Sequence, residues 1–252
     1  MRIIPRLDIK NNFVIKGINL EGLRKVGIPN NLAKKYYDEG ADELIYMDCV
    51  ASLYERSSLE KVLKDASKNI FIPFAVGGGI RSLNDALRMF SNGADKIAIN
   101  SAAIDKPQIF GDMVKKFGGQ SIILSIEAKK INPNKWVIYK NYGREKTSID
   151  VFDWIKTISK YEVGEILLTS IDYEGLANGY DIDLYKQVSK ITKIPLIASG
   201  GFGKLEHITN LVNEASVDAI TVSRQLHYDK INLKEIKEYC SKNKIFVRKS
   251  YE

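Results

Sequence analysis

The stretch IPFAVGGG at residues 72–79 returns, little changed, as IPLIASGG at residues 194–201. DELIYMD at 42–48 likewise resembles GEILLTSID at 164–172, and GADKIAINS at 93–101 resembles SVDAITVSR at 216–224. Glu165 follows Glu43 by 122 residues, as Pro195 follows Pro73, and Asp218 follows Asp95 by 123. These offsets favour an internal duplication over chance similarity among isoleucine-rich strands.

Eight short apolar runs alternate with longer amphipathic stretches along the chain. The runs are RIIPRLDI, ELIYMDCV, IPFAVGGG, DKIAINSA, SIILSIEA, EILLTSID, IPLIASGG and DAITVSRQ. Most are rich in Ile, Val and Leu, as strands buried on both faces are. Residues 30–40 and 82–93 read as helices with C-terminal caps at Gly40 and Gly93. The pattern predicts an α/β fold, a (β/α)8 TIM barrel forming one domain over residues 1–252, with half-barrels of about 1–120 and 121–252.

The bulk composition is that of a globular protein with a basic balance. Hydrophobic residues make up 44% and charged residues 27% of the 252 positions, and the net charge is +7. This charge suits an anionic substrate or an acidic partner, although solvated surface lysines explain it equally well. No basic run is interleaved with aromatic residues, so we expect no nucleic-acid partner.

Cysteine and histidine usage argues against a metal site. The two cysteines, Cys49 and Cys240, are far apart in the sequence, and the only histidines are His207 and His227. We therefore expect no metal and no other cofactor. The N-terminal residues MRIIPRLDIK resemble neither a signal peptide nor a membrane span, so we expect a reduced, cytoplasmic protein without membrane contact.

Polar side chains end most of the predicted strands. In a parallel barrel, the C-terminal ends of the strands and the loops after them form the active face. The residues at these positions are Asp8, Asp48, Asn100, Glu127, Thr169, Ser170, Asp172, Ser199 and Ser223. Any single one can instead cap the next helix. So many on one rim predict a shared polar pocket.

Glycine turns follow two strands at equivalent places in the two halves. Residues 77–79 follow the third strand and residues 200–201 follow the seventh. Glycine lets backbone N–H groups approach a phosphate closely, and Asn100, Ser101 and Ser223 end the neighbouring strands. We predict two phosphate sites on opposite sides of one mouth, and hence a substrate with a phosphate at each end.

Charged residues mark both ends of the predicted barrel. At the mouth, Asp8 and Glu127 lie on opposite strands, where a pair of carboxylates can act as general acid and general base. Lys16 either adds a cation to the mouth or is an ordinary exposed lysine. At the other end, four charged residues begin strands one, two, four and six. They form a paired ring if they point inward, or unrelated surface charges if they do not. These four are Arg2, Glu43, Lys96 and Glu165.

The chain resembles the cyclase subunit of imidazole glycerol phosphate synthase over about residues 1–248. The motifs that carry the resemblance are RIIPRLDIK, VIKGIN, DELIYMD, VGGGIRS, GADKIAINSAA, GEILLTSID, GYD and ASGGFGK. The resemblance implies a lyase in a heterodimer with a glutaminase, whose ammonia passes through the barrel. The family cleaves and cyclises an aminoimidazole-carboxamide ribulosyl bisphosphate, giving imidazole glycerol phosphate and a carboxamide ribonucleotide in histidine biosynthesis.

The resemblance also implies roles for individual residues. The essential acid maps to Asp8, the second catalytic carboxylate to Glu127, the ammonia gate to the four charged residues above, and a docking residue to Asp95. The substrate- and phosphate-binding positions map to Lys16, Asp48, Gly78, Gly79, Asn100, Ser101, Thr169, Ser170, Glu174, Gly175, Ser199, Gly200, Gly201 and Ser223.

Four residues at the mouth depart from the family pattern. Glu127 and Glu174 replace aspartates, Leu176 replaces a threonine, and Arg6 replaces a small residue. The extra methylene at Glu127 moves a catalytic oxygen by about 1 Å, enough to change a rate by about 10²-fold. If the first strand alternates regularly, Arg6 shares the inward face of Asp8 and competes with its role as an acid.

Three functions are consistent with this sequence. The first is the cyclase reaction itself. The second is that of a divergent paralogue, which supplies ammonia with a glutaminase and an amidotransferase for amidino-sugar synthesis. The third is a conduit that passes ammonia without chemistry of its own. The phosphate loops, Asp8, Lys16 and the gate favour the first, whereas the intact gate beneath an altered mouth favours the second. Arg6 and Leu176 are compatible with the third.

Overall fold

Eight parallel strands form the centre of the molecule in this computed structural model, which describes residues 1–50 and 59–248. The strands are β1 (Arg2–Lys10), β4 (Leu44–Asp48), β5 (Phe74–Gly77), β6 (Lys96–Ile99), β7 (Ile122–Asn132), β10 (Glu165–Ser170), β11 (Leu196–Ser199) and β12 (Ala219–Val222). Each lies within one of the eight predicted apolar runs or overlaps most of it. The predicted strand positions are therefore confirmed.

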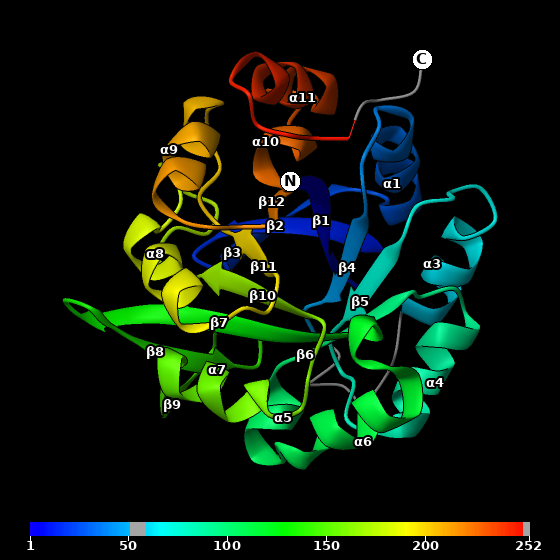
Figure 1. The fold of residues 1–252 in the computed structure, drawn as a ribbon. Coiled ribbons are helices and arrows are strands. Elements are labelled where there is room, and N and C mark those ends of the chain that lie inside the picture. Colours follow the sequence, from blue (N-terminus) through cyan, green and yellow to red (C-terminus); the bar gives the residue numbers. More distant parts are fainter. Residues whose placement is uncertain (51–58, 249–252) are drawn as a thin grey trace.

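The sheet closes on itself. Its hydrogen-bonded order is β10-β11-β12-β1-β4-β5-β6-β7, and β7 pairs in turn with β10. In the closing pair, Glu127 lies beside Thr169 and Leu124 beside Ile166. Figure 1 shows helices surrounding these strands. The (β/α)8 barrel predicted from the alternating pattern is confirmed.

The helices follow the strands in the expected order. They are α1 (Pro29–Asp38), α3 (Leu59–Ala66), α4 (Leu83–Ser91), α5 (Ser101–Asp105), α6 (Gln108–Phe117), α7 (Val151–Ser159), α8 (Ile182–Ile191), α9 (Glu206–Glu214), α10 (Arg224–His227) and α11 (Leu233–Lys242), with a 3-10 turn at Gly119–Ser121. The two predicted helices correspond to α1 and α4. Gly40 and Gly93 follow them with φ of 90° and 107°, as glycines that end a helix do.

Two β-hairpins lie outside the barrel order and were not predicted. β1 continues into β2 (Phe13–Ile18) and β3 (Glu21–Gly27), and β7 continues into β8 (Lys135–Lys140) and β9 (Glu145–Asp150), all antiparallel. The first strand of each half of the chain thus carries a hairpin. This shared feature agrees with the duplication inferred from the repeated motifs.

Hydrophobic side chains fill both sides of the barrel wall. The larger cluster lies between strands and helices and contains Leu7, Tyr46, Phe110, Trp136 and Ile220, all essentially inaccessible to solvent. A second cluster takes residues from all eight strands and occupies the barrel interior. Its members are Ile4, Ile45, Met47, Ala75, Ala98, Ile123, Leu167, Ile197 and Ala219. An apolar layer therefore separates the two ends of the barrel.

Aspartates bind neighbouring strands at the N-terminal end. The carboxylates of Asp42, Asp95 and Asp218 accept the backbone N–H groups of Ile3, Phe74 and Leu196, at 2.7, 2.8 and 2.8 Å respectively. Asp42 also forms a buried ion pair with Lys237 of α11, at 2.7 Å. Asp95 therefore has a structural role in addition to any role in docking.

In the part of the chain that the structure describes, no helix is both long enough and apolar enough to cross a membrane.

The Asp42–Lys237 pair allows a stability prediction. Asp42→Ala leaves a buried ammonium and an N–H group without their acceptor, so we expect a loss of about 3–5 kcal/mol in the free energy of unfolding. Asp218→Ala removes the same type of backbone contact without stranding a buried cation and should cost about 1 kcal/mol. Urea unfolding of both variants measures the difference. Equal losses of unfolding free energy in the two variants would contradict a stabilising role of the buried ion pair.

Candidate active site

Two pockets lie on opposite sides of the barrel mouth, where the strands end. One follows β5 and β6, has a cavity volume of about 60 Å³, and is lined by Asp48, Gly78, Gly79, Asn100, Ser101 and Glu127 among others. The other follows β11 and β12, has a cavity volume of about 20 Å³, and is lined by Lys16, Glu174, Gly175, Gly200, Gly201 and Ser223 among others. Twelve of the residues that the sequence analysis assigned to the active site thus line one or other of these two pockets.

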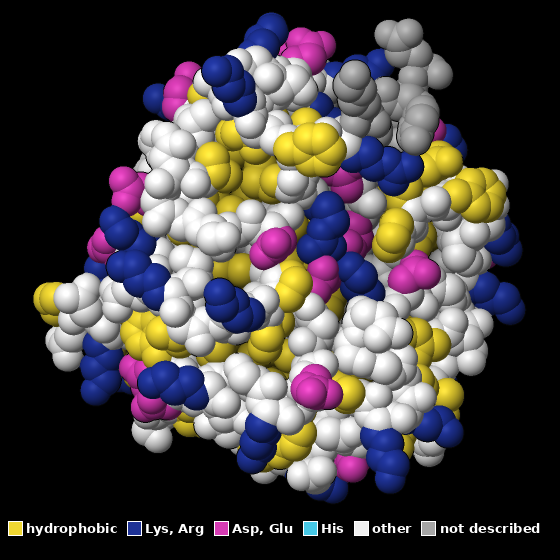
Figure 2. Space-filling model, viewed as in Figure 1, with side chains coloured by type: hydrophobic (Ala, Val, Ile, Leu, Met, Phe, Trp, Pro, Cys, Tyr) yellow, Lys and Arg dark blue, Asp and Glu magenta, His cyan; other side chains and the backbone are white. Residues whose placement is uncertain are grey.

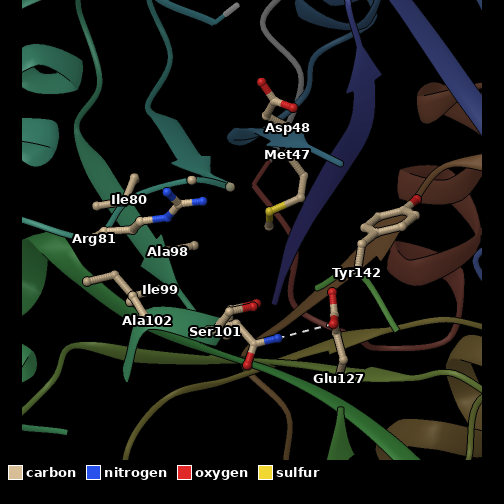
Figure 3. A pocket seen from close by; sticks show the side chains of 14 residues that line it. Met47, Asp48, Ile80, Arg81, Ala98, Ile99, Ser101, Ala102, Glu127 and Tyr142 are labelled. Atoms are coloured by element: carbon tan, nitrogen blue, oxygen red, sulfur yellow. Dashed lines mark hydrogen bonds between the residues drawn. The ribbon is translucent and has the colours of Figure 1, made fainter. Parts of the chain in front are cut away.

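The larger pocket contains a cation that the sequence reasoning did not single out. Arg81, two residues after the glycine turn, lines it together with Tyr142 and Ser125. Figure 3 shows the Arg81 side chain extending toward the middle of the pocket, with Glu127 and Tyr142 on the opposite side. A guanidinium beside a glycine turn suits a phosphate group.

The smaller pocket is likewise basic. Lys16 and Arg224 line it, and the Lys16 ammonium contacts the carboxylate of Glu174. The Arg224 guanidinium donates to the carbonyl oxygen of Gly175. The repeat indicated Ser223 as a site residue, but it gave no signal for a cation at Arg224 because the equivalent residue in the first half is the uncharged Ser101.

The glycine turns have backbones that other residues cannot adopt without strain. Gly78 has φ of 96°, and an added Cβ would lie 2.2 Å from the carbonyl oxygen of Asp48. Gly201 has φ of 106°, and its Cβ would lie 1.8 Å from the carbonyl oxygen of Gly179. Both turns therefore require glycine, which keeps the backbone open to a ligand.

A buried arginine occupies the barrel between the two pockets. The Nε of Arg6 donates to Oδ1 of Asp8 at 2.9 Å, and its Nη1 donates to Oγ1 of Thr169 at 2.8 Å and to Oγ of Ser199 at 3.1 Å. Burial opposes its charge, but Asp8 and Glu174 outweigh that effect and raise the pKa of Arg6. The expected inward orientation of Arg6 is thus observed, with Asp8 as its partner.

Glu127 is the other carboxylate of the mouth. Its Oε2 accepts hydrogen bonds from Nδ2 of Asn100 at 3.1 Å and from the backbone N–H of Gly143 at 2.9 Å. Burial raises its pKa to about 7, against the lowering effects of the Gly143 hydrogen bond and of Arg6. A carboxyl group with this pKa exchanges protons readily near neutral pH.

Two of the expected rim residues point elsewhere. The hydroxyl group of Ser170 donates to Oδ2 of Asp181 at 3.1 Å and lies in the buried layer outside the strands. Asp172 accepts the backbone N–H of Lys130 at 2.7 Å. Neither lines the two pockets. Ser170 faces outward because alternate residues of a strand face opposite sides, whereas Asp172 lies beyond the end of β10.

The four charged residues at the N-terminal end form a closed ring. Arg2 contacts Glu43 at 2.6 Å and Glu165 at 2.5 Å, and Lys96 contacts the same two glutamates at 2.9 and 3.0 Å. Burial raises the pKa of Glu43, although Lys96 and Arg2 oppose this. Figure 2 shows basic and acidic side chains side by side near the middle of the face in view, with hydrophobic side chains around them.

Within residues 1–50 and 59–248, no group of three His, Cys, Asp or Glu side chains is arranged to hold a metal ion.

The raised pKa of Glu127 predicts a pH dependence of stability. The folded chain holds a proton that the unfolded chain releases between the ordinary pKa of 4.5 and about 7. This contribution to stability is therefore fully present below about 4.5 and is lost as the pH rises through 7. Glu127→Gln should flatten the fall in unfolding free energy over this range, as measured with urea. An unchanged slope would contradict the raised pKa.

Comparison with known proteins identifies the family of this chain. The family model described as "Histidine biosynthesis protein" matches residues 2–232. An imidazole glycerol phosphate synthase subunit HisF from Legionella pneumophila is 54% identical over 206 residues, which cover 82% of this chain and 97% of that protein. Proteins of the same name from Clostridium botulinum and Natranaerobius thermophilus are 43% and 41% identical over 98% of both chains. The chain belongs to the family of imidazole glycerol phosphate synthase subunits HisF.

Proposed function

We propose that this chain is the cyclase subunit of an imidazole glycerol phosphate synthase and acts on a ribulosyl bisphosphate substrate with ammonia from a glutaminase subunit. The observation that carries the proposal is the pair of glycine-walled pockets on one mouth. Each has at least one cationic side chain, Arg81 in one and Lys16 and Arg224 in the other. Two such sites suit a substrate with a phosphate at each end.

Asp8 and Glu127 are proposed to carry the chemistry between the two phosphates. They lie on β1 and β7, at equivalent positions in the two halves of the barrel, each on a strand that continues into a hairpin. The substrate would then place its reacting atoms near the barrel axis.

The opposite end of the barrel suits the entry of ammonia. The ring of Arg2, Glu43, Lys96 and Glu165 closes this end, and the apolar layer with Ile4 and Leu167 follows it. An apolar layer admits neutral ammonia far more readily than the ammonium ion, because a charge is costly in a dry interior. The ring must open before ammonia can pass.

We place the glutaminase at this N-terminal end, in a heterodimer with the barrel. Phe71, just before β5, is 78% exposed, and Phe246, whose carbonyl oxygen accepts the N-terminal amino group, is 86% exposed. Exposed aromatic side chains are typical of protein interfaces. Asp95 lies at the same end and is proposed as a docking residue. We further propose a cytoplasmic location.

A turnover assay tests the proposed reaction. Purified barrel is incubated with the ribulosyl bisphosphate and excess ammonium salt, and both products are measured. We expect formation of imidazole glycerol phosphate and the carboxamide ribonucleotide without the glutaminase. Gly78→Ala should lower turnover by about 10²-fold or more, because it displaces the phosphate turn.

Gly22→Ala is the matched control for that variant. Gly22 also has positive φ, 62°, but an added Cβ meets no atom within 4 Å. It should therefore keep most of the turnover. Absence of both products with the unaltered chain, at concentrations where the substrate binds, would refute the cyclase assignment.

One observation favours a second candidate function. Arg6 fills the space beside Asp8, and Glu174 engages Lys16, so both groups that would meet the histidine-pathway substrate already have partners. This arrangement suits a divergent paralogue that delivers ammonia for amidino-sugar synthesis, or a conduit without chemistry. Tight binding of the glutaminase without turnover of the bisphosphate would support this candidate.

A further inference from the structure

The loop after each glycine turn is held by one side chain of the helix that follows it. In the first half this residue is Asp85 of α4, whose Oδ2 accepts the backbone N–H of Arg81 at 3.0 Å. In the second half it is His207 of α9, whose Nδ1 accepts the backbone N–H groups of Gly203 and Lys204, both at 3.2 Å. The two contacts lie on opposite sides of the barrel, as α4 and α9 do in Figure 1.

The two side chains occupy the same position in the internal repeat. His207 follows Asp85 by 122 residues, the spacing that also separates Pro195 from Pro73. Each lies near the start of its helix. The repeat therefore keeps an acceptor for the backbone after each turn but supplies it with different chemistry, a carboxylate in one half and an imidazole in the other.

His207 holds the backbone next to the smaller pocket. Residues 200–202 line that pocket, and Gly203 is the next residue along the chain. The carbonyl oxygen of Gly203 accepts from the buried side-chain amide of Gln225 at 2.8 Å. Its N–H and C=O groups are thus both fixed by side chains. The direction of the N–H groups at the glycine turn consequently depends on His207.

An imidazole accepts hydrogen bonds at Nδ1 only while it is neutral, with its proton on Nε2. Protonation places a hydrogen on Nδ1 and turns the acceptor into a donor that faces two other donors. A carboxylate at neutral pH has no such limit, because both of its oxygens accept. The two turns thus have equivalent anchors, but only the anchor of the second can be switched by a proton near neutral pH.

We propose that His207 is a positioning residue for the smaller pocket, where it keeps the glycine turn in its anion-binding shape only while its imidazole is neutral. This inference rests on the proposed function in assigning a substrate phosphate to that pocket. Asp85 has the same role at the larger pocket without the dependence on pH. Mild acid therefore weakens the grip on one end of a bisphosphate substrate and spares the other.

The surroundings of His207 keep it neutral at pH 7. Burial and the neighbouring Lys204 lower its pKa below the ordinary 6.5, whereas Glu206 opposes them. In the described part of the chain, these two residues are the charged groups that act on the ring. Gly179, in the loop before α8, adds no charge, and a Cβ built on it would lie 3.7 Å from the ring. The turn therefore loses its binding shape as the pH falls through the His207 pKa.

Nitrogen NMR of the full chain tests the state of His207 directly. The sequence contains only two histidines, and burial lowers the pKa of His227 to about 3. A single imidazole should therefore titrate between about pH 5 and 8. We expect its proton on Nε2 in the neutral form and a midpoint below 6.5. A neutral ring with its proton on Nδ1, or a midpoint above 6.5, would overturn the proposal.

Sulfate binding measures the consequence at each turn separately. Sulfate stays fully ionised over this pH range, and the backbone amide resonances of Gly201 and Gly79 report the two pockets. Sulfate affinity at Gly201 should fall by up to about tenfold per pH unit below the His207 pKa, because only the neutral fraction binds. Affinity at Gly79 should not fall. Constant or rising affinity at Gly201 on acidification would contradict the proposal.

Exchanging the two anchors provides matched controls. His207→Asn places an amide oxygen close to the position of Nδ1, so sulfate affinity at Gly201 should become independent of pH. Asp85→His should create the pH dependence at Gly79 instead. His207→Ala removes the acceptor and should weaken sulfate binding at Gly201 at every pH. A His207→Asn variant that keeps the pH dependence would refute the role of His207.

Lys204→Gln keeps the test valid if an exchange variant does not fold, because it leaves the anchor in place. Lys204 lowers the pKa of His207, so this variant should move the loss of sulfate affinity to higher pH. Glu206→Gln removes the opposing charge and should move it to lower pH. Shifts in the reverse directions, or no shift in either variant, would show that the loss does not follow His207.

Turnover with ammonium salt separates a positioning role from a purely structural one. Below the His207 pKa, KM for the bisphosphate should rise more steeply in the unaltered chain than in His207→Asn, while kcat follows the same pH profile in both. Equal KM profiles would contradict the proposal. An unaltered chain that binds sulfate but gives no turnover counts against the proposed function alone, and the sulfate titration then decides the role of His207.

Discussion

Every charge inside the closed barrel must be paired, and this constraint organises the whole structure. Arg2, Glu43, Lys96 and Glu165 satisfy it at the N-terminal end by forming a closed ring. Arg6, Asp8, Lys16 and Glu174 satisfy it near the mouth through contacts among β1, its hairpin and the loop after β10. Between them lies an apolar layer drawn from all eight strands. An unpaired charge in either layer would be costly enough to threaten the fold.

The same pairing gives the two carboxylates of the mouth different surroundings. Asp8 is engaged by Arg6, whereas Glu127 lines the larger pocket and is held by Asn100 and Gly143. The duplicated architecture supplies two equivalent strands, β1 and β7, whose end residues, Asp8 and Glu127, have different surroundings. A symmetric scaffold thus carries an asymmetric site, with a buried ion pair on one side and a titratable group on the other.

Much of this arrangement follows from the sequence, and the rest depends on distances across the barrel. Ile- and Val-rich runs predicted all eight strands. The four charged residues at strand starts left open a paired ring or unrelated surface charges, and the structure shows the ring. The hairpins β2–β3 and β8–β9 escaped prediction because their strands are partly exposed and carry many charged residues, as EGLRKVG shows. The contacts of Arg6 with Thr169 and Ser199 could not be predicted because β1 faces β10 and β11 only once the barrel closes. Tyr142 lines the larger pocket from a turn in which its φ is 60°. No local sequence pattern predicts this position.

The proposed function depends on two anion sites at one mouth, at the glycine turns after β5 and β11. A crystal structure of the chain grown with tungstate, a strongly scattering substitute for phosphate, would show whether both sites exist. We expect one anion between Gly78–Gly79 and Ser101 and a second between Gly200–Gly201 and Ser223. Tungstate bound at neither turn, or at only one of them, would contradict the proposed function.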